Sequence, residues 1–294
     1  GKGNLILFLD DDVSPSKDLL IKYYEAIKRD NDDHPGYVGY IEIPVNSKNR
    51  FHLGVKLSLM TTFFSIAKMR YEITWGVTAN LLVKRDKLGD IRFRTIFPKG
   101  GGGEDIDFGI RLTRKNGKEL LCIPEARVIH PMWSGKRRFK RFFRWRYGDT
   151  NLILLYPELT FRTPPNLPEF IFILLILTSA ISIVRGVAFL LFFIFSIPLL
   201  LLFEILGTTL MIRETGLKGF SIIEYTYATF IRLINETGHI AFLLRHLKLE
   251  LIGKRFDYSC TGDFVEFEKK WTRRKFLLYL LGCALSSLLT FVVL

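Results

Sequence analysis

Apolar and polar positions follow two different patterns along the chain, and the change comes near residues 157–168. Up to this point, short apolar runs alternate with amphipathic stretches and turn signals, which is typical of a sheet covered by helices. The pattern predicts strands over residues 5–9, 37–45, 79–83, 120–123 and 127–130, a surface helix over 18–29 and a mostly helical segment over 51–71. The run at 5–9 is wholly apolar, so we expect a buried strand there.

After residue 168 the chain becomes strongly apolar. Residues 170–184 and 187–203 carry no charge, and Arg185 with Gly186 separates them. About 17 helical residues rise about 26 Å, close to the roughly 30 Å core of a bilayer. One continuous helix would place Arg185 near the bilayer centre, at a cost of about 2.5–3.5 kcal/mol. We therefore predict a transmembrane hairpin over 169–204, and a further transmembrane helix over the uncharged residues 276–294.

The segment between these spans, residues 220–248, is predicted to be an interfacial helix with one narrow polar stripe. The stripe consists of Glu224, Arg232, Asn235, Glu236, His239 and His246. Such a helix lies in the membrane interface or packs beneath the sheet domain. Arg232 or His239 then contributes to a lipid-phosphate or acceptor channel, or the stripe faces water or the sheet domain. The predicted organisation is a sheet domain over 1–156 and a membrane region over 157–294.

Residues 136–146 combine seven basic side chains with four aromatic ones, Phe139, Phe142, Phe143 and Trp145. This mixture predicts an amphipathic helix in the headgroup layer, with its basic face toward anionic lipid. Arg144 could alternatively bind a diphosphate, because a guanidinium pairs with phosphate through two hydrogen bonds. The basic clusters at 136–146 and 269–275 lie on one side of a hairpin. The positive-inside rule then places that side, and the sheet domain of this integral membrane protein, in the cytoplasm.

The composition and net charge limit the kinds of molecule that this chain is expected to bind. The chain has 294 residues, 49% of them hydrophobic, and a formal net charge of +13. We expect anionic partners such as a nucleoside diphosphate, a lipid phosphate or an anionic membrane, and no nucleic acid, because no nucleic-acid motif accompanies the charge. The three cysteines, Cys122, Cys260 and Cys283, are too far apart for a disulfide framework or a metal-ligand spacing.

Three consecutive carboxylates, Asp10, Asp11 and Asp12, end the first apolar run. Ligands of open α/β sheets lie at the carboxyl ends of strands. Neighbouring carboxylates repel one another unless a cation holds them, and Mg²⁺ is bound by one or two carboxylates together with substrate phosphates. The sequence therefore predicts a metal–diphosphate site here. An acidic turn before a helix that Pro15 opens is the alternative.

A second acidic group follows four glycines. Residues 100–103 are all glycine, and Glu104, Asp105 and Asp107 come next, where a helix is predicted to begin. Glycines let the backbone approach and close over a ligand. A carboxylate fixed at a helix start beside such a loop suits a general base. Ordinary capping of the helix by acidic residues is the alternative.

In this order, four motifs resemble those of family 2 glycosyltransferases, over about residues 1–150. They are the strand ending in Asp10–Asp12, the segment from Trp75 to Asn80, the Glu104–Asp105 pair, and Arg141-Phe142-Phe143-Arg144-Trp145. The resemblance implies an inverting enzyme that uses nucleotide-sugar donors. It also implies an α/β domain of the GT-A type, with a Rossmann-like mixed sheet, followed here by an α-helical membrane region.

The resemblance implies a role for each matched residue. Asp105 looks like the catalytic base, and Glu104 like a residue that positions the acceptor or the base. Asp10 and Asp12, with Asp11 between them, look like the pair that reaches the donor's ribose and diphosphate-bound metal, Mg²⁺ or Mn²⁺. The other implied residues are Trp75, Gly76 and Asn80 at a donor-sugar or acceptor pocket, and Arg141, Arg144 and Trp145 at a diphosphate or lipid phosphate.

His130 follows a predicted strand and precedes Pro131. Some metal-dependent glycosyltransferases supply a third metal ligand from a histidine late in the domain, and an imidazole suits Mn²⁺ better than Mg²⁺. We therefore add His130 to Asp10 and Asp12 as a candidate metal ligand. A histidine hydrogen-bonded to the backbone at a strand end is the alternative.

Two departures from the family pattern matter. Arg141 stands where processive synthases have the glutamine of their QxxRW motif, which favours a single sugar transfer. Family members also begin with a strand, a glycine-containing turn and helices that bind the nucleotide base, whereas this sequence begins at Gly1 directly before the acid-ended strand. We expect the catalytic domain to be incomplete at its N-terminus in the sequence given.

These observations predict a metal-dependent, inverting glycosyltransferase. It would move a sugar from a nucleotide-sugar donor to a hydroxyl of a lipid-linked or membrane-presented glycan acceptor. A processive polysaccharide synthase and a non-catalytic, membrane-associated scaffold that retains the fold remain alternatives.

Overall fold

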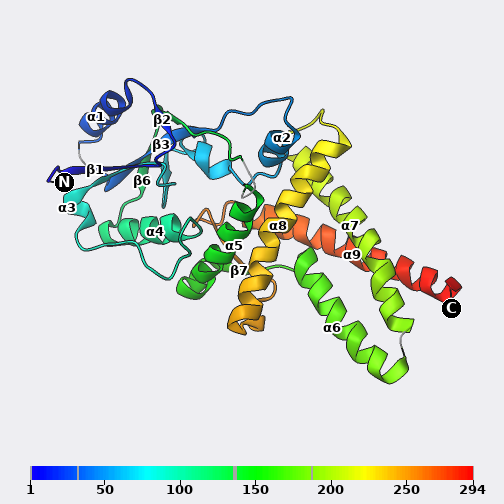
Figure 1. Ribbon diagram of the computed structural model, residues 1–294. Coiled ribbons are helices and arrows are strands. Elements are labelled where there is room, and N and C mark those ends of the chain that lie inside the picture. The colour runs from blue at the N-terminus through cyan, green and yellow to red at the C-terminus, as the bar shows by residue number, and fades with distance from the viewer. Residues whose placement is uncertain (1, 32, 135–137, 187, 294) are drawn as a thin grey trace.

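The computed structural model describes residues 2–31, 33–134, 138–186 and 188–293. The strands are β1 (Leu5–Leu9), β2 (Ser14–Pro15), β3 (Gly36–Glu42), β4 (Glu72–Ile73), β5 (Asn80–Lys84), β6 (Leu120–Ile129), β7 (Thr160–Arg162) and β8 (Lys254–Phe256). The α-helices are α1 (Leu19–Arg29), α2 (Arg50–Leu57), α3 (Arg85–Leu88), α4 (Glu104–Asn116), α5 (Arg138–Leu155), α6 (Leu167–Arg185), α7 (Ala188–Glu214), α8 (Ile222–His246) and α9 (Val265–Val293). Short 3₁₀ helices are η1 (Thr62–Lys68), η2 (Pro157–Leu159) and η3 (Leu249–Leu251). Figure 1 shows the sheet at one end of the molecule, α6, α7 and α9 at the other, and α5 and α8 between them.

The main sheet is mixed, with the order β1-β5-β3-β6-β2 and β4 paired to β6. Strands β1 and β3 are antiparallel to β5, and β3 is parallel to β6. The carboxyl ends of β1, β3 and β6 therefore lie at one edge of the sheet, where α/β proteins bind ligands. This sheet, with helices packed on it, confirms the predicted α/β fold class.

The strand at residues 5–9 is not buried, which corrects the expectation from its sequence. Its Leu5 and Leu9 side chains are 44% and 39% exposed. In the described part of the chain, β1 pairs with β5 alone and so forms an edge of the sheet. A uniformly apolar run does not distinguish an edge strand from a central one.

The two short strands predicted around Pro124 are one strand, β6. Its pairing with β3 shifts register between Gly39 and Tyr40, so the ladder skips the residues around the proline. Asn80 fills this irregularity, because its amide nitrogen donates to the Ala126 carbonyl at 2.8 Å. A Cβ on Gly39 would lie 2.2 Å from that nitrogen, so only glycine leaves room for it. Pro124 is thus accommodated at a bulge instead of ending the strand.

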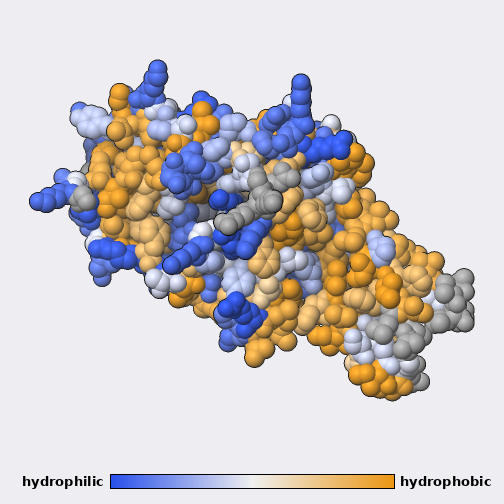
Figure 2. Space-filling model, viewed as in Figure 1, coloured by the Kyte–Doolittle hydropathy of each residue, from blue (hydrophilic) through white to orange (hydrophobic). Residues whose placement is uncertain are grey.

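In the described part of the chain, two helical segments are long and apolar enough to span a membrane, Leu167–Val184 and Leu191–Glu214. They belong to α6 and α7, which lie where the hairpin is predicted, and α7 is longer than expected because it continues beyond residue 204 to Glu214. Figure 2 shows apolar surface concentrated over this end of the molecule. The side chain of Arg185 lies outside the described residues. The third span, 276–294, corresponds to the last part of α9, which packs along α7, and stays a prediction.

Helix α8 packs against α5 and α2 of the sheet domain, and against α6 and α7. The middle of its predicted polar stripe therefore meets protein. Asn235 donates to the Phe142 carbonyl at 3.0 Å, Arg232 donates to the Ser58 carbonyl at 3.0 Å, and His239 is fully buried. Residues 220–248 therefore pack on the sheet domain, and a position at the membrane interface stays a prediction.

Helix α5 is not an interfacial helix with its aromatic residues among lipid headgroups, which corrects the expectation for residues 136–146. Phe142 is fully buried, and the ring of Phe139 packs edge-on against Phe51 of α2 and Phe230 of α8. An apolar face that suits a membrane suits a neighbouring helix equally well, and α2 and α8 supply that neighbour. Lys136 and Arg137 lie outside the described residues.

Candidate active site

Three of the predicted metal ligands come together at the carboxyl edge of the sheet. Asp10 and Asp12 lie on the link from β1 to β2, which are opposite ends of the strand order, and this link crosses the end of β6, where His130 follows. Nε2 of His130 is 3.5 Å from Asp10 Oδ2 and 3.6 Å from Asp12 Oδ1. The three side chains each offer a ligand atom within 4.8 Å of the others.

The donor set suits a divalent cation. Two carboxylates and one imidazole match the ligand preferences of Mn²⁺, and the carboxylates alone those of Mg²⁺. Asp10 and Asp12 are 42% and 49% exposed, which leaves the outer side open to water or phosphate oxygens, whereas His130 is 2% exposed. Nδ1 of His130 is 2.7 Å from the Pro131 carbonyl, so an N–H there fixes the ring with Nε2 facing the aspartates. Asp11 is exposed and lies outside this group.

Burial opposes a charge on His130, but the hydrogen bond to Asp10, the Pro131 carbonyl and the charges of Asp12 and Asp10 outweigh it and raise its pKa. The imidazole is thus set among acceptors that favour a positive partner. The carboxylates that favour a positive charge on His130 would also stabilise a divalent cation.

Asp105 lies in the first turn of α4, where two hydrogen bonds hold both of its oxygens. The Thr78 backbone N–H donates to Oδ2 at 3.2 Å, and the Thr78 hydroxyl donates to Oδ1 at 3.0 Å. Burial, then the charges of Glu104 and Asp10, raise the pKa of Asp105 to about 7, against the opposing effect of Thr78. A carboxylate with a pKa near neutral is suited to accept a proton at physiological pH. Thr78 lies inside the quoted 75–80 segment, but its role was not predicted.

The two acidic groups share one electrostatic site. The charge of Asp10 contributes to the raised pKa of both Asp105 and Glu104. Arg141 of α5 is subject to the same charges. Burial and the charge of Arg144 lower the pKa of its guanidinium overall, because they outweigh Asp12 and Asp10, which raise this pKa. Arg141 also lies over the Trp133 ring, 5.2 Å from its centroid. The sequence-predicted acids and α5 therefore face a common region.

The glycine loop lies directly on the Arg144–Trp145 pair. All four glycines have φ between 90° and 129°. A Cβ on Gly100 would lie 3.0 Å from Arg144 Nη1, and one on Gly101 would lie 3.1 Å from Trp145 Nε1. Among the described residues, Glu104 Oε2 and Arg144 Nε are buried without a hydrogen-bond partner. Buried polar atoms without a partner are uncommon, and these two lie beside the glycine loop.

Three predicted pocket residues are supporting residues in the structure. Trp75 is 5% exposed, and its indole N–H donates to the Tyr258 carbonyl at 2.7 Å. Asn80 is fully buried, and it also accepts a hydrogen bond from the Tyr23 hydroxyl at 2.7 Å. Gly76 is buried against Val38. All three positions are buried, and their place at a donor-sugar or acceptor pocket stays a prediction.

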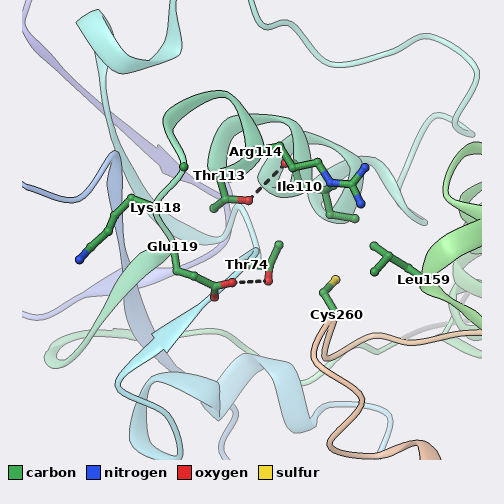
Figure 3. Close-up of a pocket in the computed structure, with 9 residues that line it drawn as sticks. Thr74, Ile110, Thr113, Arg114, Lys118, Glu119, Leu159 and Cys260 are labelled. Atoms are coloured by element: carbon green, nitrogen blue, oxygen red, sulfur yellow. Dashed lines mark hydrogen bonds between the residues drawn. The ribbon is translucent and has the colours of Figure 1, made fainter.

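Two cavities differ in whether a predicted metal ligand lines them. One, of about 520 Å³, adjoins the metal group and is lined by Asp12, Ser14, Asn46 and His52 together with apolar residues. The other, of about 260 Å³, is lined by Ile110, Thr113 and Arg114 from the second half of α4, and neither Glu104 nor Asp105 lines it. Figure 3 shows this cavity. Its acid, Glu119, accepts a hydrogen bond from Thr74 at 2.9 Å. The first cavity is the one placed to receive part of a substrate.

The charge of Glu104 beside Asp105 leads to a pH prediction. If ionised Asp105 is needed for turnover, activity rises with pH through the pKa of Asp105. Glu104→Gln removes a like charge, so we expect this acid limb to move to lower pH. The pH dependence of kcat/KM measures the shift, and Glu125→Gln, an exposed site, is the matched control. A bound cation acts on all variants alike, and an unchanged limb in Glu104→Gln contradicts the coupling.

Comparison with known proteins gives one assignment. No curated protein matches the chain. The model of the family described as glycosyl transferase family group 2 matches residues 5–233, more than three quarters of the chain. The match includes both acidic groups, the glycine loop and the arginine–tryptophan pair of α5. The chain therefore belongs to glycosyl transferase family group 2 and is a glycosyltransferase.

Proposed function

We propose that this glycosyltransferase is a metal-dependent, inverting enzyme that uses a nucleotide-sugar donor. The observation that carries the proposal is the convergence of Asp10, Asp12 and His130 with Asp105 in one electrostatic site. One group suits a cation on a diphosphate, and the other suits a base. This is the pair of functions that displacement of a nucleoside diphosphate by a hydroxyl requires.

The residues would act as follows. Asp10, Asp12 and His130 hold the divalent cation, which when bound offsets the charge of the departing diphosphate. Asp105 accepts the proton of the acceptor hydroxyl, whose oxygen forms a bond to the anomeric carbon. The bond from that carbon to the diphosphate oxygen breaks with its electron pair. A single displacement inverts the anomeric centre.

We further propose that the acceptor is lipid-linked or is a glycan presented at a membrane, with the catalytic domain on the cytoplasmic side. The support is the pair of apolar helices α6 and α7, which join the catalytic domain through α8. Arg141 in place of glutamine favours one transfer over polymerisation. The length of the product made by the full-length enzyme distinguishes the two.

Removal of the metal tests the chemistry. We expect a chelator to abolish release of nucleoside diphosphate from UDP-glucose or GDP-mannose, whichever the enzyme uses, and Mn²⁺ or Mg²⁺ to restore it. Loss of even an outer-sphere partner weakens metal binding by about 10–100-fold. Because His130 is proposed as a direct ligand, His130→Ala should raise the half-saturating Mn²⁺ concentration at least about tenfold. His246→Ala, an exposed site, is the control. Full activity after chelation contradicts the metal proposal and leaves glycosyl transfer standing.

A further inference from the structure

The segment after α8 reaches the catalytic centre, although it lies beyond the family match. The match ends at residue 233. From the end of α8, η3 and β8 lead to Tyr258. This tyrosine contacts both of the structures that hold Asp105.

The first structure is the segment that contains Thr78. The Trp75 indole donates to the Tyr258 carbonyl at 2.7 Å. Three residues later, Thr78 donates to both oxygens of Asp105. Trp75 is 5% exposed and stacks on Phe63, with 4.6 Å between ring centroids. The bond to Tyr258 therefore anchors the segment that orients Asp105.

The second structure is the contact of α5 with the glycine loop. The Tyr258 hydroxyl donates to Asp149 Oδ2 at 2.7 Å and accepts from Arg146 at 2.9 Å. A Cβ on Gly103 would lie 3.3 Å from the Cα of Asp149. Asp149 thus lies against the residue that precedes Glu104 and Asp105.

The hydrogen bonds of Asp149 offset the cost of burying its carboxylate. Burial, with the charge of Glu104 from α4, raises the pKa of Asp149 to about 7, and this rise is opposed by the hydrogen bond from Tyr258 and by the charge of Arg146. Buried polar groups of this kind are costly unless they are paired. In the proposed mechanism, none of these groups touches the reacting atoms.

We propose that Tyr258 and Asp149 form a positioning pair, which fixes the Thr78 segment and the glycine loop relative to each other and so holds Asp105 in place. The inference depends on the proposed function because it takes Asp105 as the base. The C-terminal segment, residues 249–258, is then part of the catalytic apparatus, and it connects the membrane helices to Asp105.

Tyr258→Phe tests the pair in the full-length protein, because it removes the hydroxyl and keeps the ring and the carbonyl. A misplacement of about 1 Å can cost about 100-fold in rate, so we expect kcat to fall at least about tenfold, with the KM for the donor changed less than about twofold. Asp149→Ala should match this loss. Asp149→Asn keeps an acceptor for the hydroxyl and should retain most of the activity.

Tyr37→Phe is the matched control, because the Tyr37 hydroxyl also donates to an aspartate, Asp30, at 2.8 Å, and Tyr37 lies at the N-terminal end of β3, opposite the edge of the sheet that carries the site. It should leave kcat within about twofold of wild type. The Tyr258→Phe/Asp149→Ala double variant should be no slower than either single variant, because the two residues act as a unit. Additive losses, or a Tyr258→Phe enzyme with wild-type kcat, overturn the proposal.

Amide hydrogen exchange over residues 100–105 gives a readout independent of turnover. We expect faster exchange there in Tyr258→Phe and not in Tyr37→Phe, beyond the change that the global stability of each variant accounts for. Unchanged exchange contradicts the positioning pair. A wild-type protein that turns over neither donor contradicts the proposed function instead, and the exchange result still decides on the pair.

Discussion

Asp105→Asn should lower kcat by about 10²–10⁴-fold, the usual contribution of a general base, while leaving nucleotide binding nearly intact. The amide keeps the shape of the side chain and an acceptor for Thr78, but it cannot take a proton from the acceptor hydroxyl. Binding of UDP or GDP in the presence of Mn²⁺ depends on Asp10, Asp12 and His130. Rates of donor turnover and calorimetric titration with nucleotide measure the two effects separately.

Stability separates this loss from unfolding. The pKa of Asp105 is raised to about 7 from the ordinary value of 3.8. Its ionisation therefore lowers the free energy of unfolding as the pH rises between these values. Asp105→Asn removes that charge, so at pH 7 the variant should melt no lower than wild type. Asp90→Asn, at a fully exposed side chain, should change neither rate nor melting. Equal loss of nucleotide binding and turnover in Asp105→Asn would remove Asp105 from the role of base.

The acidic groups of the site could be predicted because their signals are local. Asp10–Asp12 end an apolar run and Glu104–Asp105 follow four glycines, so chain direction alone places them at a strand end and at a helix start. Their convergence follows from the sheet order, in which the β1–β2 link crosses the end of β6. His130 is predicted from its place after a strand together with the resemblance to metal-dependent glycosyltransferases.

The partners of these acids could not be predicted. Tyr258 is separated from Asp149 by more than 100 residues, and a tyrosine in a loop carries no signal of which helix it meets. The bulge contacts of Asn80 were not predicted, because a polar residue at the start of a strand is equally suited to a ligand and to a bulge. Its amide bonds to Ala126 and Tyr40 depend on a register shift that the sequence does not reveal.

The helical part of the fold shows the same limit. Length and hydropathy locate α6 and α7 well, since a long uncharged run of apolar residues usually forms a helix that spans a membrane or lies in a core. The face of an amphipathic helix does not identify its neighbour. Phe139 and Phe142 of α5 pack on protein, where a membrane surface was expected, because α2 and α8 lie close to α5 only after the chain has folded.

The largest effect on stability is expected from Arg255→Met. Arg255 of β8 makes two hydrogen bonds with Glu169, at 2.9 and 2.5 Å, and both side chains are buried. Glu169 lies in the first turn of α6, and His239 of α8 is 3.4 Å from it. This ion pair therefore joins the start of the first apolar helix to the C-terminal segment and to α8.

Removing one partner of a buried ion pair leaves the other charge without compensation, which costs about 3–5 kcal/mol. We expect Arg255→Met to lower the free energy of unfolding by that amount, measured by denaturant titration in mixed micelles. Arg114→Met breaks a pair of similar length, 2.6 Å to Glu158, in which both side chains are about half exposed, and should cost less than about 1 kcal/mol. Glu169→Gln with Arg255→Met should recover much of the loss, because neither charge of the pair remains and the amide oxygen can still accept from a buried backbone N–H. Equal effects of Arg255→Met and Arg114→Met would show that burial does not make this pair important. Since β8 leads directly to Tyr258, Arg255→Met should also slow turnover in protein that is still folded.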